Sequence, residues 1–349
     1  MKRPSVFALL FVILIAVLVP QRVDAISFNL DSIAAWGKFP RFCVNTYRWG
    51  DKFFNGYDTA YVNPTGYKFN VKLTTDSWIE AYNFQLPNHT RIFMTSDNST
   101  SAGLYLTYLA VSVGYDINLS KILGGVDRSR KRFRFGFNCM LFAAEFYMSK
   151  NDGGTTIKRF GEYDHVHIPF DGVNNSTWGL DAYYFFTHKR YSEAATFNFS
   201  RIQRKSHGSF YTGFSIYSQK LDFDFNVLPE PLKNELPSTW PNKHYRVNTH
   251  NYAVRFGYGY NWVFAPKWVL GVSESPIIGI RKGFVVSDVE KTSVSIYNRL
   301  KLSVVWNSNK WFFGFVGKAD LAILSDKETL YAGGTISGEA VIGYRFNIW

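Results

Sequence analysis

The segment that decides the fold runs from Tyr252 to Phe264 and reads YAVRFGYGYNWVF. Its even-numbered positions are all large apolar or aromatic residues, whereas its odd-numbered positions are mostly small or polar, with Arg255 and Asn261 among them. Successive side chains of a β-strand point to opposite faces, so this period of two predicts a strand with one apolar face and one polar face.

The same alternation recurs along the chain. It is found at 109–117, 133–141, 294–306 and 311–323. The alternating segments are about 9 to 16 residues long, whereas a membrane barrel needs about 9 to 11 per crossing and soluble strands have about 5 or 6. Tyr and Trp gather at the ends of the apolar faces, at Trp262, Trp268, Trp306 and Trp311, where headgroup belts lie in membrane barrels. The pattern therefore favours an all-β, antiparallel transmembrane barrel of the outer-membrane type over a soluble sandwich or lipocalin-like barrel.

Thirteen segments are candidates for strands. They are 67–73, 77–86, 102–117, 131–148, 155–160, 177–187, 194–204, 208–219, 246–264, 268–282, 293–307, 311–324 and 332–349. Single-chain bacterial barrels have an even number of strands, so we assign 155–160 to a loop or hairpin tip and predict about twelve strands within residues 67–349. We expect long loops at Gly161–Thr177 and at Val227–Lys243, which is rich in proline. Residues 26–66 precede clear alternation and are expected to form a periplasmic extension or an interior plug.

The amino terminus has the features of a signal peptide. Lys2 and Arg3 precede an apolar run from Val6 to Val19, and cleavage is expected after Ala25. Residues 1–25 would then be removed on export. Of the two cysteines, Cys139 falls in an alternating segment and is expected to be a small buried hydrophobe, so the chain is no disulfide scaffold.

Composition excludes other classes. Aromatic residues make up 18% of the 349 residues and charged residues 19%, which is incompatible with a disordered chain. Mean hydropathy is −0.14, and beyond the signal region no apolar run is long enough for a membrane helix. The net charge of +12 is not gathered into one patch, so we expect no nucleic-acid partner.

Two segments carry a resemblance to a known family. The first runs from Tyr57 to Leu73, and the second, from Ala182 to Phe210, contains HKRYS at 188–192 and QRKSHGSF at 203–210. On these residues the chain resembles a bacterial domain-of-unknown-function family of predicted outer-membrane-type barrels. The final Trp349, on an amphipathic strand, also resembles the end that the barrel assembly machinery recognises. The alternating apolar residues of that strand, however, include Ile348 and not Trp349. The resemblance implies fold and location, and it implies no functional residue.

One pair of residues could form a catalytic site. His207 and Ser209 lie two residues apart, so they share a strand face, and an imidazole there could activate a serine hydroxyl as in outer-membrane lipid hydrolases. The alternation places Phe210 and Phe214 toward lipid and the pair in the interior, away from the lipid boundary. An interior polar pair is therefore the preferred interpretation, and the hydrolase is the alternative.

Two further groups of residues deserve a functional hypothesis. His165 and His167 share one face but lack an identified third ligand, so a solvated loop is favoured over a metal site. Basic runs lie at Arg128–Arg134 and Arg201–Lys205, where they could bind lipopolysaccharide phosphates or bias the lumen toward anions. The competing interpretation is that they extend from strand ends to the interface.

Taken together, the residues predict a non-enzymatic outer-membrane barrel: a small channel, a ligand-binding barrel or a structural envelope protein. Inward tyrosines at 211, 217 and 297 would narrow its lumen. Expected partners are outer-membrane lipids, lipopolysaccharide and the assembly machinery. We expect no catalytic, cofactor-binding or metal-binding residue and no cofactor. The alternatives are the His207/Ser209 hydrolase and a secreted soluble β-protein.

Overall fold

The computed structural model describes residues 35, 37–86, 89–108, 111–119, 130–151, 154–238, 240–286, 289–325 and 329–347. They belong to two compact units, one reaching to Trp49 and the other covering Gly50–Asn347. The predicted signal peptide and the terminal Trp349 lie outside the described residues. Among the helices of the described residues, none is both long enough and apolar enough to cross a membrane.

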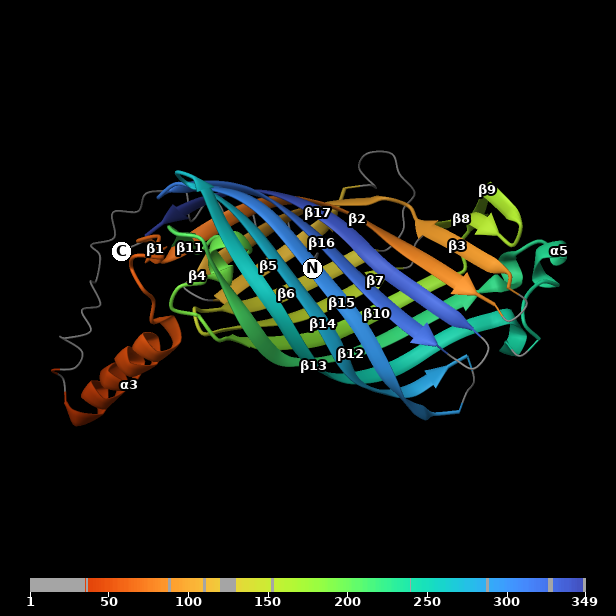
Figure 1. Cartoon of the computed structure of the whole chain (residues 1–349), viewed down its shortest axis with the longest axis horizontal. Helices are drawn as coiled ribbons and strands as arrows, with labels where there is room; N and C mark the ends of the chain where they lie inside the picture. The colour runs from red at the N-terminus through yellow and green to blue at the C-terminus, as the bar shows by residue number, and fades with distance from the viewer. Residues whose placement is uncertain are drawn as a thin grey trace, which may run out of the picture. The chain divides into compact units, whose positions relative to one another are not determined.

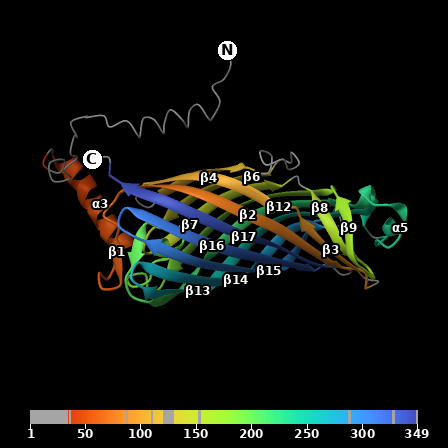
Figure 2. The same cartoon turned by 90° about the horizontal axis from the view of Figure 1, so that it is seen from above.

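Twelve described strands of the larger unit form a closed antiparallel barrel (Figure 1, Figure 2). In order around it they are β2 (Phe69–Gln85), β4 (Ser99–Tyr108), β5 (Val111–Asn118), β6 (Arg130–Asn138), β7 (Phe142–Asn151), β10 (Val173–Phe185), β12 (His207–Asp224), β13 (His244–Ala265), β14 (Trp268–Val285), β15 (Lys291–Asn307), β16 (Trp311–Ser325) and β17 (Leu330–Phe346). Strand β17 pairs with β2 from Leu330 opposite Gln85 to Phe346 opposite Phe69, which closes the sheet. The predicted fold class and strand number are confirmed.

The number is right although several strand boundaries are wrong. Segments 67–73 and 77–86 form the single strand β2, and 194–204 is not a barrel strand. In the other direction, 102–117 divides into β4 and β5, and 131–148 divides into β6 and β7. Two strands lost and two gained leave the count at twelve. The reason is that alternation continues through a turn of two or three residues, so a tight hairpin reads as one long strand.

The apolar side chains lie on the outside of the barrel. Val254 and Phe256 are 47% and 57% exposed, whereas the neighbouring Arg255 is 2% exposed and Asn261 is fully buried. A soluble barrel would bury the first pair and expose the second, because apolar burial drives its folding. This inside-out distribution is that of a membrane barrel, and it argues against the soluble alternative.

The two ends of the barrel differ in their connections. At one end, hereafter the short-turn end, β4–β5, β6–β7, β13–β14 and β15–β16 are joined by two or three residues. At the other, the long-loop end, connections carry β3 (Arg91–Ser96), β8 (Thr155–Phe160), β9 (Tyr163–Phe170), η1 (Phe225–Val227), α5 (Glu230–Lys233) and η2 (Pro241–Lys243). Figure 1 shows β3, β8, β9 and α5 together at this end. The loop expected at Val227–Lys243 is confirmed.

The strands β3, β8 and β9 extend the sheet beyond the barrel from the edge of β2. The assignment of 155–160 to a hairpin tip is therefore confirmed, because β8 pairs with β3 and β9 rather than crossing the barrel. The loop expected at Gly161–Thr177 is wrong, since it contains β9 and the start of β10. The segment is polar because its strand stands clear of the lipid, and polar composition of this kind predicts a loop.

An apolar core closes the lumen at the long-loop end. Phe84 on β2 is fully buried, and its ring centroid lies 5.0 Å from those of Phe223 on β12 and Tyr245 on β13. In the strand order, β12 lies on the opposite side of the barrel from β2. Rings that touch across the barrel leave no space for water between them, so this core fills the lumen where the rings meet.

Candidate functional site

At the short-turn end the lumen is filled by the connection between β10 and β12, residues 186–206, hereafter the plug. It contains α4 (Glu193–Thr196) and β11 (Arg201–Gln203). Tyr191, Ala195 and Thr196 are completely buried, and Phe199 is 2% exposed. The sequence prediction of a strand over 194–204 is wrong because the apolar residues that alternate there face the lumen instead of lipid.

Contacts with the neighbouring strands β2, β16 and β17 hold the plug in the lumen. Arg345 of β17 is 1% exposed and donates hydrogen bonds to the Phe199 carbonyl oxygen, the Nε bond being 3.2 Å long. The rings of Phe199 and Phe312 of β16 stack at 5.1 Å. The Asn198 side-chain oxygen accepts a hydrogen bond from Lys72 Nζ of β2 at 3.2 Å. The plug therefore bonds to both strands that close the barrel.

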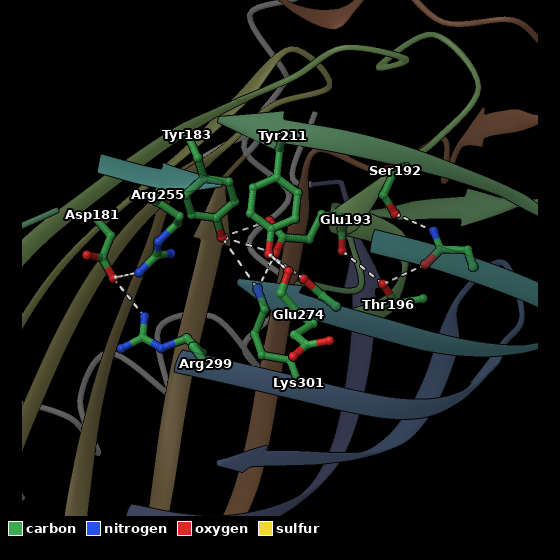
Figure 3. A network of polar contacts seen from close by, with 12 residues as sticks. Asp181, Tyr183, Ser192, Glu193, Thr196, Tyr211, Arg255, Glu274, Arg299 and Lys301 are labelled. Atoms are coloured by element: carbon green, nitrogen blue, oxygen red, sulfur yellow. Dashed lines mark hydrogen bonds and ion pairs between the residues drawn. The ribbon is translucent and has the colours of Figure 1, made fainter. Parts of the chain in front are cut away.

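A buried ion pair anchors α4 to the lumen wall. The carboxylate of Glu193, whose side chain is 2% exposed, pairs with the ammonium of Lys301 on β15. Tyr183 of β10 donates its hydroxyl to Glu193 Oε2 at 2.9 Å, and Lys301 Nζ lies 4.6 Å from the centroid of the Phe197 ring. Figure 3 shows Glu193 of the plug meeting Tyr183 and Lys301 from two separate strands. A buried charge that is paired and hydrogen-bonded in this way fixes the position of the element that carries it.

A second ion cluster lies deeper in the lumen. Asp181 of β10 is paired with Arg255 of β13 at 2.9 Å and with Arg299 of β15 at 2.7 Å (Figure 3). Arg299 also pairs with Asp320 of β16. One buried carboxylate thus joins two guanidinium groups from strands that are not its neighbours, which ties the barrel wall together through its interior.

A third cluster lines the opposite wall. Arg134 of β6 donates to the hydroxyl of Tyr105 at 2.6 Å and lies 3.4 Å from Asp116 and 3.8 Å from Glu339. Tyr105 in turn donates to Asp116 Oδ2 at 2.7 Å. Of the predicted basic run 128–134, the structure therefore places Arg134 inside the lumen as part of an ion-pair network rather than at the lipid interface.

Residues of the three clusters line a cavity of about 270 Å³ in the lumen, hereafter the chamber. Its lining combines five basic residues with six acidic ones, together with tyrosines and amides. The charged residues are Arg134, Arg255, Arg299, Lys301, Lys318, Asp76, Glu80, Glu145, Asp181, Asp320 and Glu339. Such a wall can bind small polar or charged groups of either sign, because donors and acceptors lie on all sides.

The predicted His207/Ser209 pair is inside the barrel, but its members have separate partners. Ser209 is 1% exposed, its hydroxyl donates to the Phe210 carbonyl oxygen at 2.7 Å, and it accepts from the Thr187 amide at 2.9 Å. His207 Nδ1 lies 2.7 Å from the Gly208 carbonyl oxygen, and the ring packs edge-on against Tyr61. The serine hydroxyl thus fastens the start of the plug to β12.

The other predicted site residues lie at the two ends. His165 and His167 are exposed on β9, and no cluster of three or more metal-ligating side chains occurs among the described residues. In the second basic run, Arg201 lies over the Tyr57 ring at 5.5 Å and Lys205 lies over the Tyr61 ring at 5.6 Å. This run therefore packs against the segment that leads into β1 (Val62–Pro64), which pairs with β11.

Sequence reasoning missed the residues that form the chamber. The period-two alternation puts Arg255, Arg299 and Lys301 on inward faces, but nothing in it identifies their partners Asp181 and Glu193. A charged residue at an inward position of a strand is the sequence feature that indicates a buried ion pair, because burying the charge requires a counter-charge elsewhere in the lumen.

Comparison with solved structures finds other barrels. The chain is similar to the outer membrane protease OmpT from Escherichia coli, with 8% identity, TM-score 0.37, and 80% of this chain and 96% of that chain covered. It is similar to the translocator domain of the autotransporter NalP from Neisseria meningitidis, with 12% identity, TM-score 0.40, and 79% and 88% covered. For the P. putida toluene transporter TodX the values are 8% identity, TM-score 0.29, and 84% and 96%. The fold assignment itself rests on the strand pairing described above.

A search of curated proteins finds no match to this chain. A family profile, in contrast, matches residues 56–346, which include both segments that carried the resemblance and the whole barrel. The profile is that of the Domain of unknown function (DUF4421). The plug, the ion clusters and the chamber all lie within the matched residues, and the chain belongs to the DUF4421 family.

Proposed function

We propose that this protein is a non-enzymatic outer-membrane barrel that binds a small polar or charged solute in its chamber and is closed at both ends at rest. The outward apolar surface supports the location. It ends at the short-turn end in a belt of aromatic side chains, where Trp306 stacks on Phe313 at 4.4 Å and Trp311 packs against Tyr344 at 4.8 Å. In bacterial barrels the short turns face the periplasm, so we assign the short-turn end to that side.

The observation that carries the proposal is a charged chamber between two different closures. The plug closes one end through ion pairs and hydrogen bonds, and the Phe84 core closes the other through apolar contacts. An open porin would lack both closures, and a purely structural anchor would have no use for a chamber lined by eleven charged residues. A closed solute-binding barrel accounts for both features.

The described contacts also support a non-enzymatic role. Ser209 uses its hydroxyl to bind the plug, and the buried carboxylates of Asp181 and Glu193 are engaged by cationic partners. A catalytic serine needs a base within hydrogen-bonding reach, and the imidazole of His207 faces a backbone carbonyl and Tyr61 instead. An unchanged lipid profile in cells carrying Ser209→Ala would agree with this role, whereas loss of a lipid product would support the hydrolase alternative.

The test is single-channel conductance of the purified protein in planar bilayers. The wild type is expected to be silent, and so is each variant that weakens one closure: Lys301→Gln for the plug, and Phe84→Ala with Phe223→Ala for the apolar core. The variant that combines all three substitutions is expected to conduct, because only then is a continuous water path available. Lys310→Gln, an exposed change at the short-turn end, is the matched control.

Two results would contradict the proposal. Steady conductance of the wild type would show an open pore. Silence of the combined variant, in protein whose barrel is shown to be folded, would show that the lumen is closed by groups other than these two sets.

A further inference from the structure

Helix α3 (Lys38–Asn55) has large aromatic side chains exposed along one side. Phe42, Trp49 and Phe53 are 66%, 64% and 51% exposed. They are spaced by seven and four residues, which places them on a single face of an α-helix. Exposed apolar stripes of this size on a soluble surface mark an interaction site.

A basic stripe runs beside the aromatic one. Lys38, Arg41 and Arg48 are exposed, and Arg41 and Arg48 directly precede Phe42 and Trp49 in the sequence. The helix sequence holds four basic residues and one acidic residue. Aromatic residues flanked by Lys and Arg on one helix are typical of helices that lie in the plane of a membrane interface, where rings insert between acyl chains and cations meet phosphates.

The short-turn end of the barrel is chemically similar. Three exposed lysines each directly precede an aromatic residue with which a barrel strand begins: Lys68 before Phe69, Lys267 before Trp268 and Lys310 before Trp311. Further exposed basic residues at this end are Lys189, Arg190, Arg204 and Lys205. This arrangement fits anionic headgroups beside an aromatic belt. Only residues 56–68 separate α3 from β2, so the chain joins the helix to the same end.

We infer that α3 is a second membrane-binding element, lying on the anionic phospholipid surface of the leaflet that the short-turn end meets. Phe42, Trp49 and Phe53 insert into the interface, while Lys38, Arg41 and Arg48 contact lipid phosphates. The inference is independent of the function proposed for the chamber, because it rests on the helix and the barrel rim alone. Lipid is the partner that accounts for the aromatic and basic stripes together, and the barrel rim carries the same pairing of aromatic and basic residues.

The test follows a spin label on α3 in the otherwise complete exported protein. The label is attached at Asn45→Cys, one turn before Trp49, in a background with Cys43→Ser and Cys139→Ser. The protein is placed in nanodiscs of phosphatidylcholine alone or of phosphatidylcholine mixed with phosphatidylglycerol. The readout is collision of the label with oxygen, which enriches in lipid, against a nickel chelate, which stays in water.

The label is expected to shift from water-exposed to lipid-exposed when phosphatidylglycerol is present. Arg41→Gln with Arg48→Gln should lower the inserted-to-free ratio about thirtyfold, since each basic residue near an anionic surface contributes about fivefold. Arg91→Gln with Lys291→Gln removes the same charge at the long-loop end and should leave the inserted-to-free ratio unchanged. Trp49→Ser should abolish insertion in every lipid mixture.

Three outcomes would overturn the inference. A label that remains in water in both lipid mixtures excludes membrane binding. A label protected from both reagents regardless of lipid shows that the helix packs on protein. Insertion that is unaffected by phosphatidylglycerol and by the arginine substitutions excludes headgroup recognition.

Discussion

Asp181 shows how much a single buried carboxylate does in this barrel. It is 2% exposed and neutralises both Arg255 and Arg299. We expect Asp181→Asn to lower the free energy of unfolding by about 3–5 kcal/mol, because it leaves Arg255 buried without an anionic partner. Urea unfolding in detergent micelles measures this change.

The control for that measurement is Asp222→Asn. Asp222 also pairs with basic groups, His244 at 2.9 Å and Arg246 at 3.7 Å, but its side chain is 42% exposed. Ion pairs in contact with water contribute little, so a change within about 1 kcal/mol is expected. Equal effects of the two substitutions would mean that the lumen cluster is as well solvated as the surface.

The reactivity of Cys139 is a second prediction about a single residue. It is free and 4% exposed, and its sulfur lies 3.3 Å from the Phe142 carbonyl oxygen in the β6–β7 turn. The expected buried cysteine is confirmed, although it lies in a turn rather than on a strand face. Burial raises the pKa of its thiol, so the reactive thiolate forms at a higher pH than the pH at which a free cysteine ionises.

In a Cys43→Ser background the remaining thiol should therefore resist a maleimide reagent at neutral pH and react once the protein is unfolded in urea. Labelling should increase only as the pH rises beyond about 8.5, the usual thiol pKa. Rapid labelling of the folded protein at neutral pH would mean that the β6–β7 turn opens readily.

At the scale of elements, one side chain of the last strand joins the plug to the barrel wall and to the β15–β16 turn. Arg345 donates to the carbonyl oxygens of Phe199, Ser308 and Asn309, at 2.7 Å in the case of Ser308. Hydrogen bonds from charged groups contribute about 1.5–3 kcal/mol each. Arg345→Met should therefore lower the hydrogen-exchange protection of residues 197–203 by at least tenfold.

The comparison for that experiment is Lys310→Met, which removes an exposed charge at the same end. It should leave exchange in the plug unchanged. If Arg345→Met altered exchange across every strand instead of the plug, the residue would be stabilising the barrel as a whole.

The elements also show what the sequence could predict. Alternation identified the long strands β12 to β17 because a one-residue slip would turn every apolar side chain away from lipid. It failed at β2, because Thr75 and Ser77 interrupt the apolar outward face, although the neighbouring Thr74 and Asp76 point into the lumen and are each 2% exposed. It failed at the plug for the opposite reason, since Ala195 and Phe199 alternate like lipid-facing residues but pack inside the barrel.

The candidate site was less predictable than the fold. Asp181 and Arg299 are 118 positions apart in the chain, and Lys301 and Glu193 are 108 apart. Period-two alternation gives the direction of each side chain. Which residues meet across the lumen depends on strand tilt and stagger, which a single sequence does not encode locally.

At the scale of the whole molecule, closure of the sheet predicts resistance to detergent. The β17–β2 pairing runs the full length of both strands, so the barrel has no free edge at which unfolding can begin. Protein extracted from the envelope should migrate faster in a detergent gel before boiling than after it.

A variant offers the matched comparison. Gly343→Trp places a bulky side chain where even a Cβ would lie 2.0 Å from the Phe312 ring, so its folded form should lose the heat-dependent shift at a lower temperature. An absence of any shift in the wild type, with the protein in a soluble fraction, would contradict the membrane barrel.

The position of the plug in the chain restricts how the lumen can open. Its two ends continue directly into β10 and β12, which are adjacent strands of the wall. A plug at a chain terminus can leave the lumen as a separate body, but one tethered at both ends can only swing on its hinges at Phe186 and Ser206. Any opening of the lumen at this end would therefore be a displacement of limited reach, with the plug still tethered to the wall on both sides.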